Sequence, residues 1–175
     1  MKLARQDHLL VDGYNVINAW PELNIFKDNL EFARDRLVDI MAHYGAFKDY
    51  QVIIVFDAHF VVGGEMHRQV VKGLSVIYTE EGETADSCIE KMAYMLVRQG
   101  EAVYVATSDG AEQMLVLGIG AYRISARELL KDVKRVNKVI NERFTENTQN
   151  YHRHELESRL NGDIAKRLND IRRGR

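Results

Sequence analysis

The sequence predicts an α/β fold built around a mostly parallel sheet of about five strands, and three observations lead to this class. Short runs of β-branched and apolar residues alternate with longer stretches that repeat apolar residues at helical spacing. Acidic residues follow several of the apolar runs directly. No internal repeat or low-complexity linker interrupts the 175 residues, which suffice for one domain with a sizeable core. This alternation is typical of parallel strands joined by right-handed helical crossovers.

The predicted strands are short and rich in Val, Ile and Leu. In chain order they are residues 9–11, 51–56, 74–78, 102–106 and 121–124. Between the second and third strands, residues 58–73 contain two adjacent glycines and no clear periodicity, so we expect a mobile loop there. Residues 18–29 contain the single proline, Pro21, and are also predicted to form a loop.

The predicted helices carry recognisable start and stop signals. They cover residues 30–44, 84–99 and 109–118, and a long one follows residue 125. Thr84 is the expected N-cap of the second helix and Gly100 its C-terminal stop. Ser125 and Glu128 have the spacing of a capping box. After residues 145–147 we expect a second helical stretch, so the predicted domains are residues 1–145 and a basic helical extension, residues 146–175.

The composition predicts a cytoplasmic protein with no membrane partner. Apolar residues make up 46% and charged residues 29%, as in ordinary globular proteins. The single cysteine, Cys88, excludes an internal disulfide framework and fits a reducing compartment. The first eight residues lack the apolar stretch of a signal peptide, and no segment approaches the roughly 20 apolar residues of a membrane helix.

Charge is distributed unevenly along the chain. From Lys131 onward there are 12 Lys and Arg against 7 Asp and Glu, whereas the first 130 residues hold 12 against 19. A basic tail on an acidic body suggests a polyanionic partner. An ordinary solvated helix would explain the same surplus.

Four short acidic stretches are the most informative feature. They are Val11-Asp12-Gly13-Tyr14-Asn15, Val55-Phe56-Asp57-Ala58, Glu83-Thr84-Ala85-Asp86 and Thr107-Ser108-Asp109-Gly110. Three follow predicted strands and one lies where a helix begins. Parallel strands end at one edge of a sheet, and ligands bind in the crevice there. Carboxylates gathered at that edge repel one another unless a cation joins them, so the pattern predicts a divalent-metal site and phosphate chemistry.

Each acidic residue also has a structural explanation. Asp12-Gly13 is a common turn dipeptide, although Asn15 lies close enough to point into the same crevice. Asp57 ends a buried strand with no helical pattern after it, which favours a ligand over a cap. Asp86 can serve the dipole of its helix, and Asp109 can cap the next helix.

Several enzyme classes leave no trace in the sequence. There is no Walker A motif, GxGxxG, CxxC pair or GxSxG, and the histidines lack metal-ligand spacing. The second aspartate of a haloacid-dehalogenase-type phosphatase is missing after Asp12.

The motifs together resemble the YacP-like NYN-domain family. They are the four acidic stretches above together with Trp20-Pro21-Glu22-Leu23, Ala33-Arg34-Asp35-Arg36-Leu37 and Ser125-Ala126-Arg127-Glu128-Leu129-Leu130, in an ordered match over residues 9–139. The resemblance implies a three-layer, PIN-like domain with an acidic metal-binding crevice. It further implies an endoribonuclease, with messenger RNA as substrate and the ribosome as a further partner.

The resemblance places the family's catalytic positions on the residues singled out above. They are Asp12, Asn15, Asp57, Asp86 and Asp109. The four aspartates are predicted to hold Mg²⁺ or Mn²⁺, and Asn15 to position the scissile phosphate or a water. Ser108, Arg68 and Lys72 are predicted to contact the substrate, and Glu83 to support the ligands.

Two other functions fit the same residues. One is an RNA- or ribosome-binding module with little catalytic activity, in which the basic tail supplies phosphate contacts. The other is a metal-dependent phosphatase acting on small phosphate esters at the same acidic edge.

Overall fold

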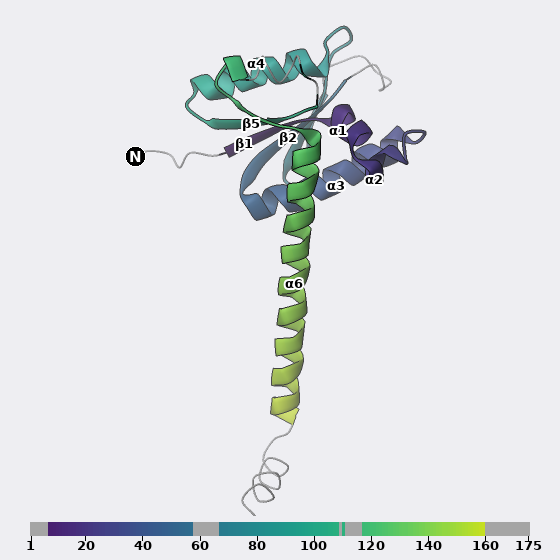
Figure 1. Cartoon of the computed structure of the whole chain (residues 1–175), viewed down its shortest axis with the longest axis vertical. Coiled ribbons are helices and arrows are strands. Elements are labelled where there is room, and N and C mark those ends of the chain that lie inside the picture. The colour runs from purple at the N-terminus through teal and green to yellow at the C-terminus, as the bar shows by residue number, and fades with distance from the viewer. Residues whose placement is uncertain (1–6, 58–66, 109, 111–116, 160–175) are drawn as a thin grey trace, which may run out of the picture. The chain divides into compact units, whose positions relative to one another are not determined.

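The computed structural model describes residues 7–57, 67–108, 110 and 117–159, and only the backbone for residues 152–159. The chain divides into two compact units, residues 1–134 and residues 135–175. The first unit contains the sheet and the helices that cover it (Figure 1). The predicted domain boundary after residue 145 falls inside one helix, α6 (Ala126–Arg159), and stays a prediction.

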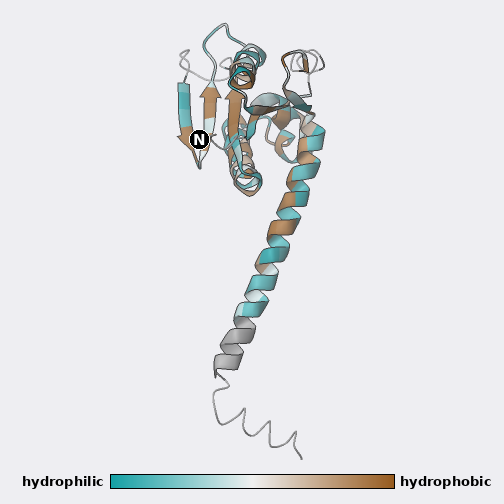
Figure 2. Ribbon diagram, turned by 90° about the vertical axis from the view of Figure 1, so that its left-hand side faces the viewer, coloured by the Kyte–Doolittle hydropathy of each residue, from teal (hydrophilic) through white to brown (hydrophobic). Residues whose placement is uncertain are grey.

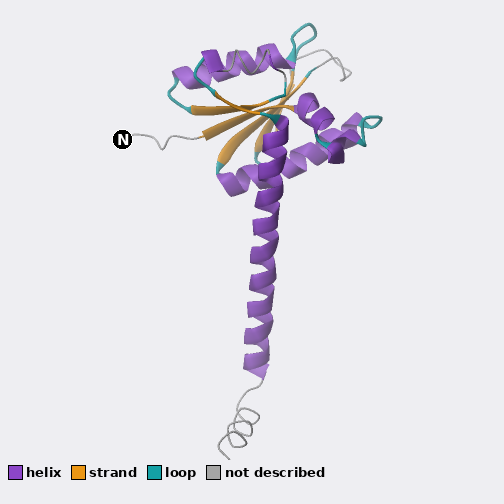
Figure 3. Ribbon diagram, viewed as in Figure 1, coloured by secondary structure: helices purple, strands orange, loops and turns teal. Residues whose placement is uncertain are grey.

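Six strands form one sheet in the order β3-β4-β2-β1-β5-β6. The strands are drawn in orange in Figure 3. They are β1 (Asp7–Asp12), β2 (Tyr50–Phe56), β3 (His67–Val71), β4 (Leu74–Tyr78), β5 (Ala102–Ala106) and β6 (Tyr122–Ile124). All neighbouring pairs are parallel except β3 and β4, which are antiparallel. The predicted α/β class with a mostly parallel sheet is confirmed.

The register aligns the ends of the five parallel strands. Asp12 pairs with Val55 of β2, and Val11 pairs with Ala106 of β5. We call the side of the sheet where these strands end the carboxyl edge; it is formed by Asp12, Phe56, Tyr78, Ala106 and Ile124 and the residues that follow them. The opposite side, where the same strands begin, is the amino edge.

Helices cover both faces of the sheet and complete three layers (Figure 1). Helix α4 (Ala85–Arg98) lies on one face, and α1 (Gly13–Ala19), α2 (Pro21–Asn24) and α3 (Leu30–Lys48) lie on the other. The strands β1, β2, β4 and β5 supply most of the buried apolar residues of the sheet, and the hydrophobic strands are drawn in brown in Figure 2. Buried strand residues pack against Ala85, Cys88, Ile89 and Ala93 of α4. No helix in the described ranges is long and apolar enough to cross a membrane.

The predicted helix signals are present where the sequence put them. The Thr84 hydroxyl accepts a hydrogen bond from the Ser87 amide at 3.2 Å, and Gly100 ends α4 at φ +86°. At α6, Glu128 N donates to Ser125 Oγ at 3.2 Å, and Ser125 N donates to Glu128 Oε2 at 2.8 Å. The capping box is therefore confirmed.

Three predictions of local structure were wrong. Residues 18–29 are not one loop, because α1 runs to Ala19 and Pro21 begins α2, where its missing amide proton costs nothing. Part of the predicted loop 58–73 is the strand β3, since a two-residue turn with positive φ at Lys72 and Gly73 returns the chain along β4; residues 58–66 lie outside the described ranges. The helix α6 passes through residues 145–147 without a break.

Candidate functional site

Asp12 is a buried carboxylate at the carboxyl edge of the central strand. The residue is only 8% exposed. It caps α1, because Asp12 Oδ1 accepts a hydrogen bond from the backbone N–H of Asn15 at 3.1 Å. Burying a carboxylate costs free energy unless hydrogen bonds or a positive charge offset the loss of water. The cap fixes the orientation of this carboxylate at the place where the sequence predicted a ligand.

Asn15 and Ser108 are held together across the edge. Asn15 Oδ1 accepts a hydrogen bond from Ser108 N at 2.8 Å, which joins α1 to the residue two positions after β5. Ser108 Oγ in turn accepts from Ala126 N at 3.3 Å, and Ala126 O accepts from Trp20 Nε1 at 2.6 Å. Asn15 thus orients the backbone that leads to Asp109, and its amide oxygen is engaged in doing so.

The other predicted acidic residues lie on different elements. Asp57 follows β2, the neighbour of β1, directly after Phe56. Asp86 is exposed in the first turn of α4, on one face of the sheet. Glu83 precedes the N-cap of that helix, Thr84, and Glu83 Oε1 pairs with Lys91 Nζ at 2.7 Å. Asp109 lies outside the described residues.

The donor chemistry of the edge fits a hard divalent cation. Asp12 and Asp57 offer carboxylate oxygens, which Mg²⁺ prefers, whereas the amide oxygen of Asn15 already accepts from Ser108 N. Within the part of the chain that the structure describes, no three His, Cys, Asp or Glu side chains are grouped closely enough to hold a metal ion. Mg²⁺ usually takes only one or two carboxylates and completes its shell with waters and substrate phosphates. The described residues therefore suit a partial shell, with Asp86 and Asp109 as the other predicted ligands.

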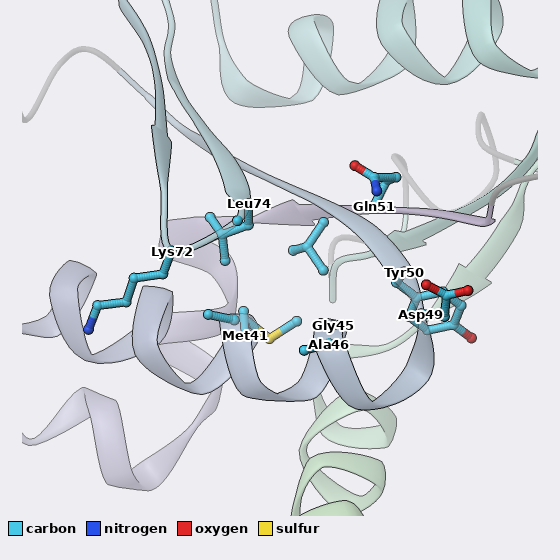
Figure 4. A pocket seen from close by; sticks show the side chains of 11 residues that line it. Met41, Gly45, Ala46, Asp49, Tyr50, Gln51, Lys72 and Leu74 are labelled. Atoms are coloured by element: carbon cyan, nitrogen blue, oxygen red, sulfur yellow. The ribbon is translucent and has the colours of Figure 1, made fainter.

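The two predicted basic contacts are not brought to this site. Arg68 lies on β3, three strand spacings from β1, or about 14 Å, and donates to Ser75 Oγ at 3.2 Å. Lys72 lies in the hairpin turn at the amino edge and pairs with Asp39 of α3. There it lines a cavity of about 190 Å³ between the hairpin turn and the end of α3, with Asp49 and Tyr50 (Figure 4).

The structure adds a group at the carboxyl edge that the residue patterns did not single out. Arg34 of α3 donates from Nη1 to the Tyr14 hydroxyl at 2.8 Å, and its guanidinium carbon lies 5.9 Å from the centre of the Tyr78 ring. Burial raises the pKa of the Tyr78 phenol, and the positive charge of Arg34 partly opposes this rise. In the sequence, Arg34 belonged to the segment 33–37 of the family resemblance, but no role at the site was predicted for it.

Comparison with known proteins gives one consistent result. The chain matches the YacP-like NYN domain over residues 9–173. It is 49% identical over 138 residues to the YacP protein of Bacillus subtilis (strain 168), covering 78% of this chain and 81% of the relative. It is also similar to the crystal structure of Rae1 (YacP) from Bacillus subtilis, with a TM-score of 0.74, 43% identity and coverage of 97% and 96% of the two chains. A mutant of Rae1 matches with a TM-score of 0.70 and 45% identity over 81% of this chain and 83% of the mutant.

Proposed function

Because this chain belongs to the YacP-like NYN domain family, we propose that it is a metal-dependent endoribonuclease that hydrolyses phosphodiester bonds of RNA. Membership of this PIN-like family is consistent with a nuclease in general. RNA as substrate, cleavage within the chain, Mg²⁺ or Mn²⁺ as cofactor and messenger RNA on the ribosome as target are the finer parts of the proposal. The observation that carries it is the buried carboxylate of Asp12, which caps α1 at the carboxyl edge next to the hydrogen-bonded pair Asn15 and Ser108.

The residues of the edge have separate roles in this proposal. Asp12, with Asp57, Asp86 and Asp109, would hold the ion, and Asn15 would keep the backbone near Ser108 in place for the scissile phosphate. When bound, a divalent ion lowers the pKa of a water and offsets the negative charge that grows on the phosphate. This water is the attacking group in this scheme, so no side-chain nucleophile is needed.

The decisive experiment is cleavage of a structured RNA with Mg²⁺ or Mn²⁺. Asp12→Asn keeps a side chain that can cap α1 but removes the charge, so the fold is expected to survive. Loss of a ligand is expected to lower the rate at least about 100-fold, since even residues that only support ligands cost 10–100-fold. Asp86→Asn tests the ligand predicted on α4 in the same way.

Asp49→Asn is the matched control. Asp49 ends α3 at the amino edge with φ 57°, a conformation that Asn also adopts readily. This variant is expected to cleave like wild type. Equal cleavage by wild type, Asp12→Asn and Asp86→Asn would remove the metal site from the proposal. Titration with Mn²⁺, or anomalous scattering from a crystal soaked in Mn²⁺, checks metal binding without reference to activity.

The surplus of positive charge after Lys131 favours a second candidate function, an RNA- or ribosome-binding module. Binding through Lys and Arg weakens steeply as salt rises, because counterions are released from the phosphates. A chain that ends at Thr148 lacks most of this charge. If full-length protein binds RNA but never cleaves it, and the shortened chain loses that binding, the module is the better description.

A further inference from the structure

Arg34 is held at the carboxyl edge by contacts with a cluster of three aromatic rings, those of Tyr14, Phe56 and Tyr78. The Tyr14 and Phe56 rings meet edge to face with centroids 5.1 Å apart, and the Phe56 and Tyr78 rings stack with centroids 5.6 Å apart. Arg34 contacts the two outer members of this series, Tyr14 through its hydroxyl and Tyr78 through the ring face. The cluster is thus continuous from α1 through β2 to β4.

The cluster also sets the position of Arg34 relative to the predicted ligands. Tyr14 follows Asp12 by two residues, and Phe56 directly precedes Asp57. Phe56 is fully buried, and Gly13 packs so closely on it that a Cβ at that position would lie 2.2 Å from the ring. Little freedom remains between the arginine and the strand ends that carry Asp12 and Asp57.

The guanidinium keeps its charge in this place. It carries five N–H donors, of which one meets Tyr14. Among the side chains that the structure describes, no carboxylate pairs with Arg34. Several lysines differ in this respect, because each has an acidic partner: Lys48, Lys72, Lys91 and Lys134. A planar, pre-oriented cation with donors to spare matches the geometry of a phosphate group.

We propose that Arg34 binds a backbone phosphate of the RNA at the carboxyl edge, next to the bond that is cut. This inference rests on the proposed function and names a contact that the predicted basic residues Arg68 and Lys72 do not make there. Tyr14 and Tyr78 act as positioning residues, since one hydrogen-bonds the guanidinium and the other supports its flat face.

The test is binding of a fluorescently labelled single-stranded RNA in EDTA, measured over a series of KCl concentrations. Without metal no cleavage follows, so binding is read separately from hydrolysis. Arg34→Ala is expected to weaken binding about tenfold at low salt. It is also expected to reduce the slope of log affinity against log salt by about 0.7, the value of one lost phosphate contact on a single strand. A purely structural arginine would leave that slope unchanged.

Arg98 provides a matched control. It too donates to a tyrosine hydroxyl, Tyr94, at 3.1 Å, and lies 5.7 Å from the centre of that ring, but it stands in the last turn of α4, toward the amino edge. Arg98→Ala is expected to leave both affinity and slope unchanged. Arg34→Lys keeps the charge without the planar donors, so it should retain the slope while losing part of the affinity; it also serves if Arg34→Ala does not fold.

The outcomes separate this inference from the proposed function. Wild-type cleavage together with an unchanged slope in Arg34→Ala and unchanged affinity in Arg34→Lys would overturn the role of Arg34 and leave the nuclease standing. A reduced slope in Arg34→Ala with no cleavage by wild type would support the phosphate contact and overturn the hydrolase. Wild-type protein that binds no RNA would overturn both.

Discussion

At each edge of the sheet a cation lies close to a tyrosine ring. Lys48 at the amino edge has an acidic partner, whereas Arg34 at the carboxyl edge has none among the described residues. At the amino edge, Lys48 lies 5.9 Å from the centre of the Tyr44 ring and 6.0 Å from that of Tyr50. Asp132 accepts from Lys48 at 3.0 Å and from the Tyr44 hydroxyl at 2.7 Å, so the cation is neutralised where it stands. At the carboxyl edge, Arg34 lies over Tyr78 and no described carboxylate pairs with it.

The difference teaches how one motif serves two purposes. A cation over an aromatic ring that also has an acidic partner holds two elements together, here α3 and the first turns of α6. The same cation without an acidic partner keeps a net charge that a polyanion can use. The tyrosines of the amino edge extend the structural role, because Tyr50 and Tyr104 lie 5.6 Å apart and Tyr104 and Tyr122 lie 5.1 Å apart between ring centroids. Burial raises the pKa of Tyr50 and Tyr104, so both remain neutral at physiological pH.

The largest effect on this comparison is expected from Gly13→Ala, which disrupts the aromatic cluster of the carboxyl edge. The added Cβ would lie 2.2 Å from Phe56 Cε1, so the ring or α1 must shift. Overpacking of this kind costs about 1–3 kcal/mol of folding free energy. The midpoint temperature of thermal unfolding is expected to fall by several degrees. The affinity for RNA should also fall, because Tyr14 and Arg34 move.

Gly118→Ala is the control for that substitution. A Cβ at Gly118 meets no atom within 4 Å, and φ is not positive there. Replacing this glycine should leave stability unchanged or raise it by up to about 1 kcal/mol through lower chain entropy. Equal thermal stability of the two variants would contradict the close packing of Gly13 on Phe56.

Two tyrosine substitutions separate the effect on folding stability from the effect on RNA binding. Tyr44→Phe removes the hydrogen bond to the Asp132 carboxylate and should cost about 1–2 kcal/mol, since bonds to charged groups are worth more than neutral ones. RNA binding should not change. Tyr14→Phe should weaken RNA binding two- to threefold and should lower the free energy of unfolding less than Tyr44→Phe does, because Tyr14 and Arg34 are half-exposed and water can replace their hydrogen bond, whereas Tyr44 is buried. If Tyr44→Phe weakens RNA binding as much as Tyr14→Phe does, the distinction between the two edges is wrong.

The smallest effect concerns Ser125, which caps α6 at the carboxyl edge. Hydrogen bonds from the Ser125 hydroxyl, and then from its backbone amide, lower the pKa of Glu128. A lowered folded-state pKa contributes stability above the unfolded-state pKa of about 4.3, and this is lost as pH falls through the folded value. Ser125→Ala should cost about 1 kcal/mol near pH 7. Urea unfolding at several pH values should show that the difference in unfolding free energy between wild type and Ser125→Ala becomes smaller below about pH 4. A difference that stays constant with pH would contradict the role of Glu128.

Much of the fold was predictable because it depends on neighbours in sequence. The strand from Leu74 to Tyr78, the Thr84 cap, the Gly100 stop and the Ser125–Glu128 box follow from local rules and are present. The failures have a common cause. The strand β3 has an exposed pattern without alternation and exists because β4 pairs with it, and α1 and α2 form where the composition indicated a loop.

The candidate site divides in the same way. The carboxylates at strand ends were predictable, since strand direction alone brings Asp12 and Asp57 to one edge. That Lys72 turns to the opposite edge, and that Glu83 pairs with Lys91, depends on the hairpin turn and the start of α4.

By itself, the sequence determined the α/β class, the family and the edge at which Asp12 and Asp57 lie, because apolar periodicity and strand polarity are properties of the linear chain. Only the tertiary structure decided which cations are neutralised. Lys48 and Asp132 are 84 positions apart in the sequence. Arg34, Tyr14 and Tyr78 belong to three separate elements and meet only in the folded chain. Charge pairing falls off within a few ångströms, so it is decided by folded distances that residue order does not contain.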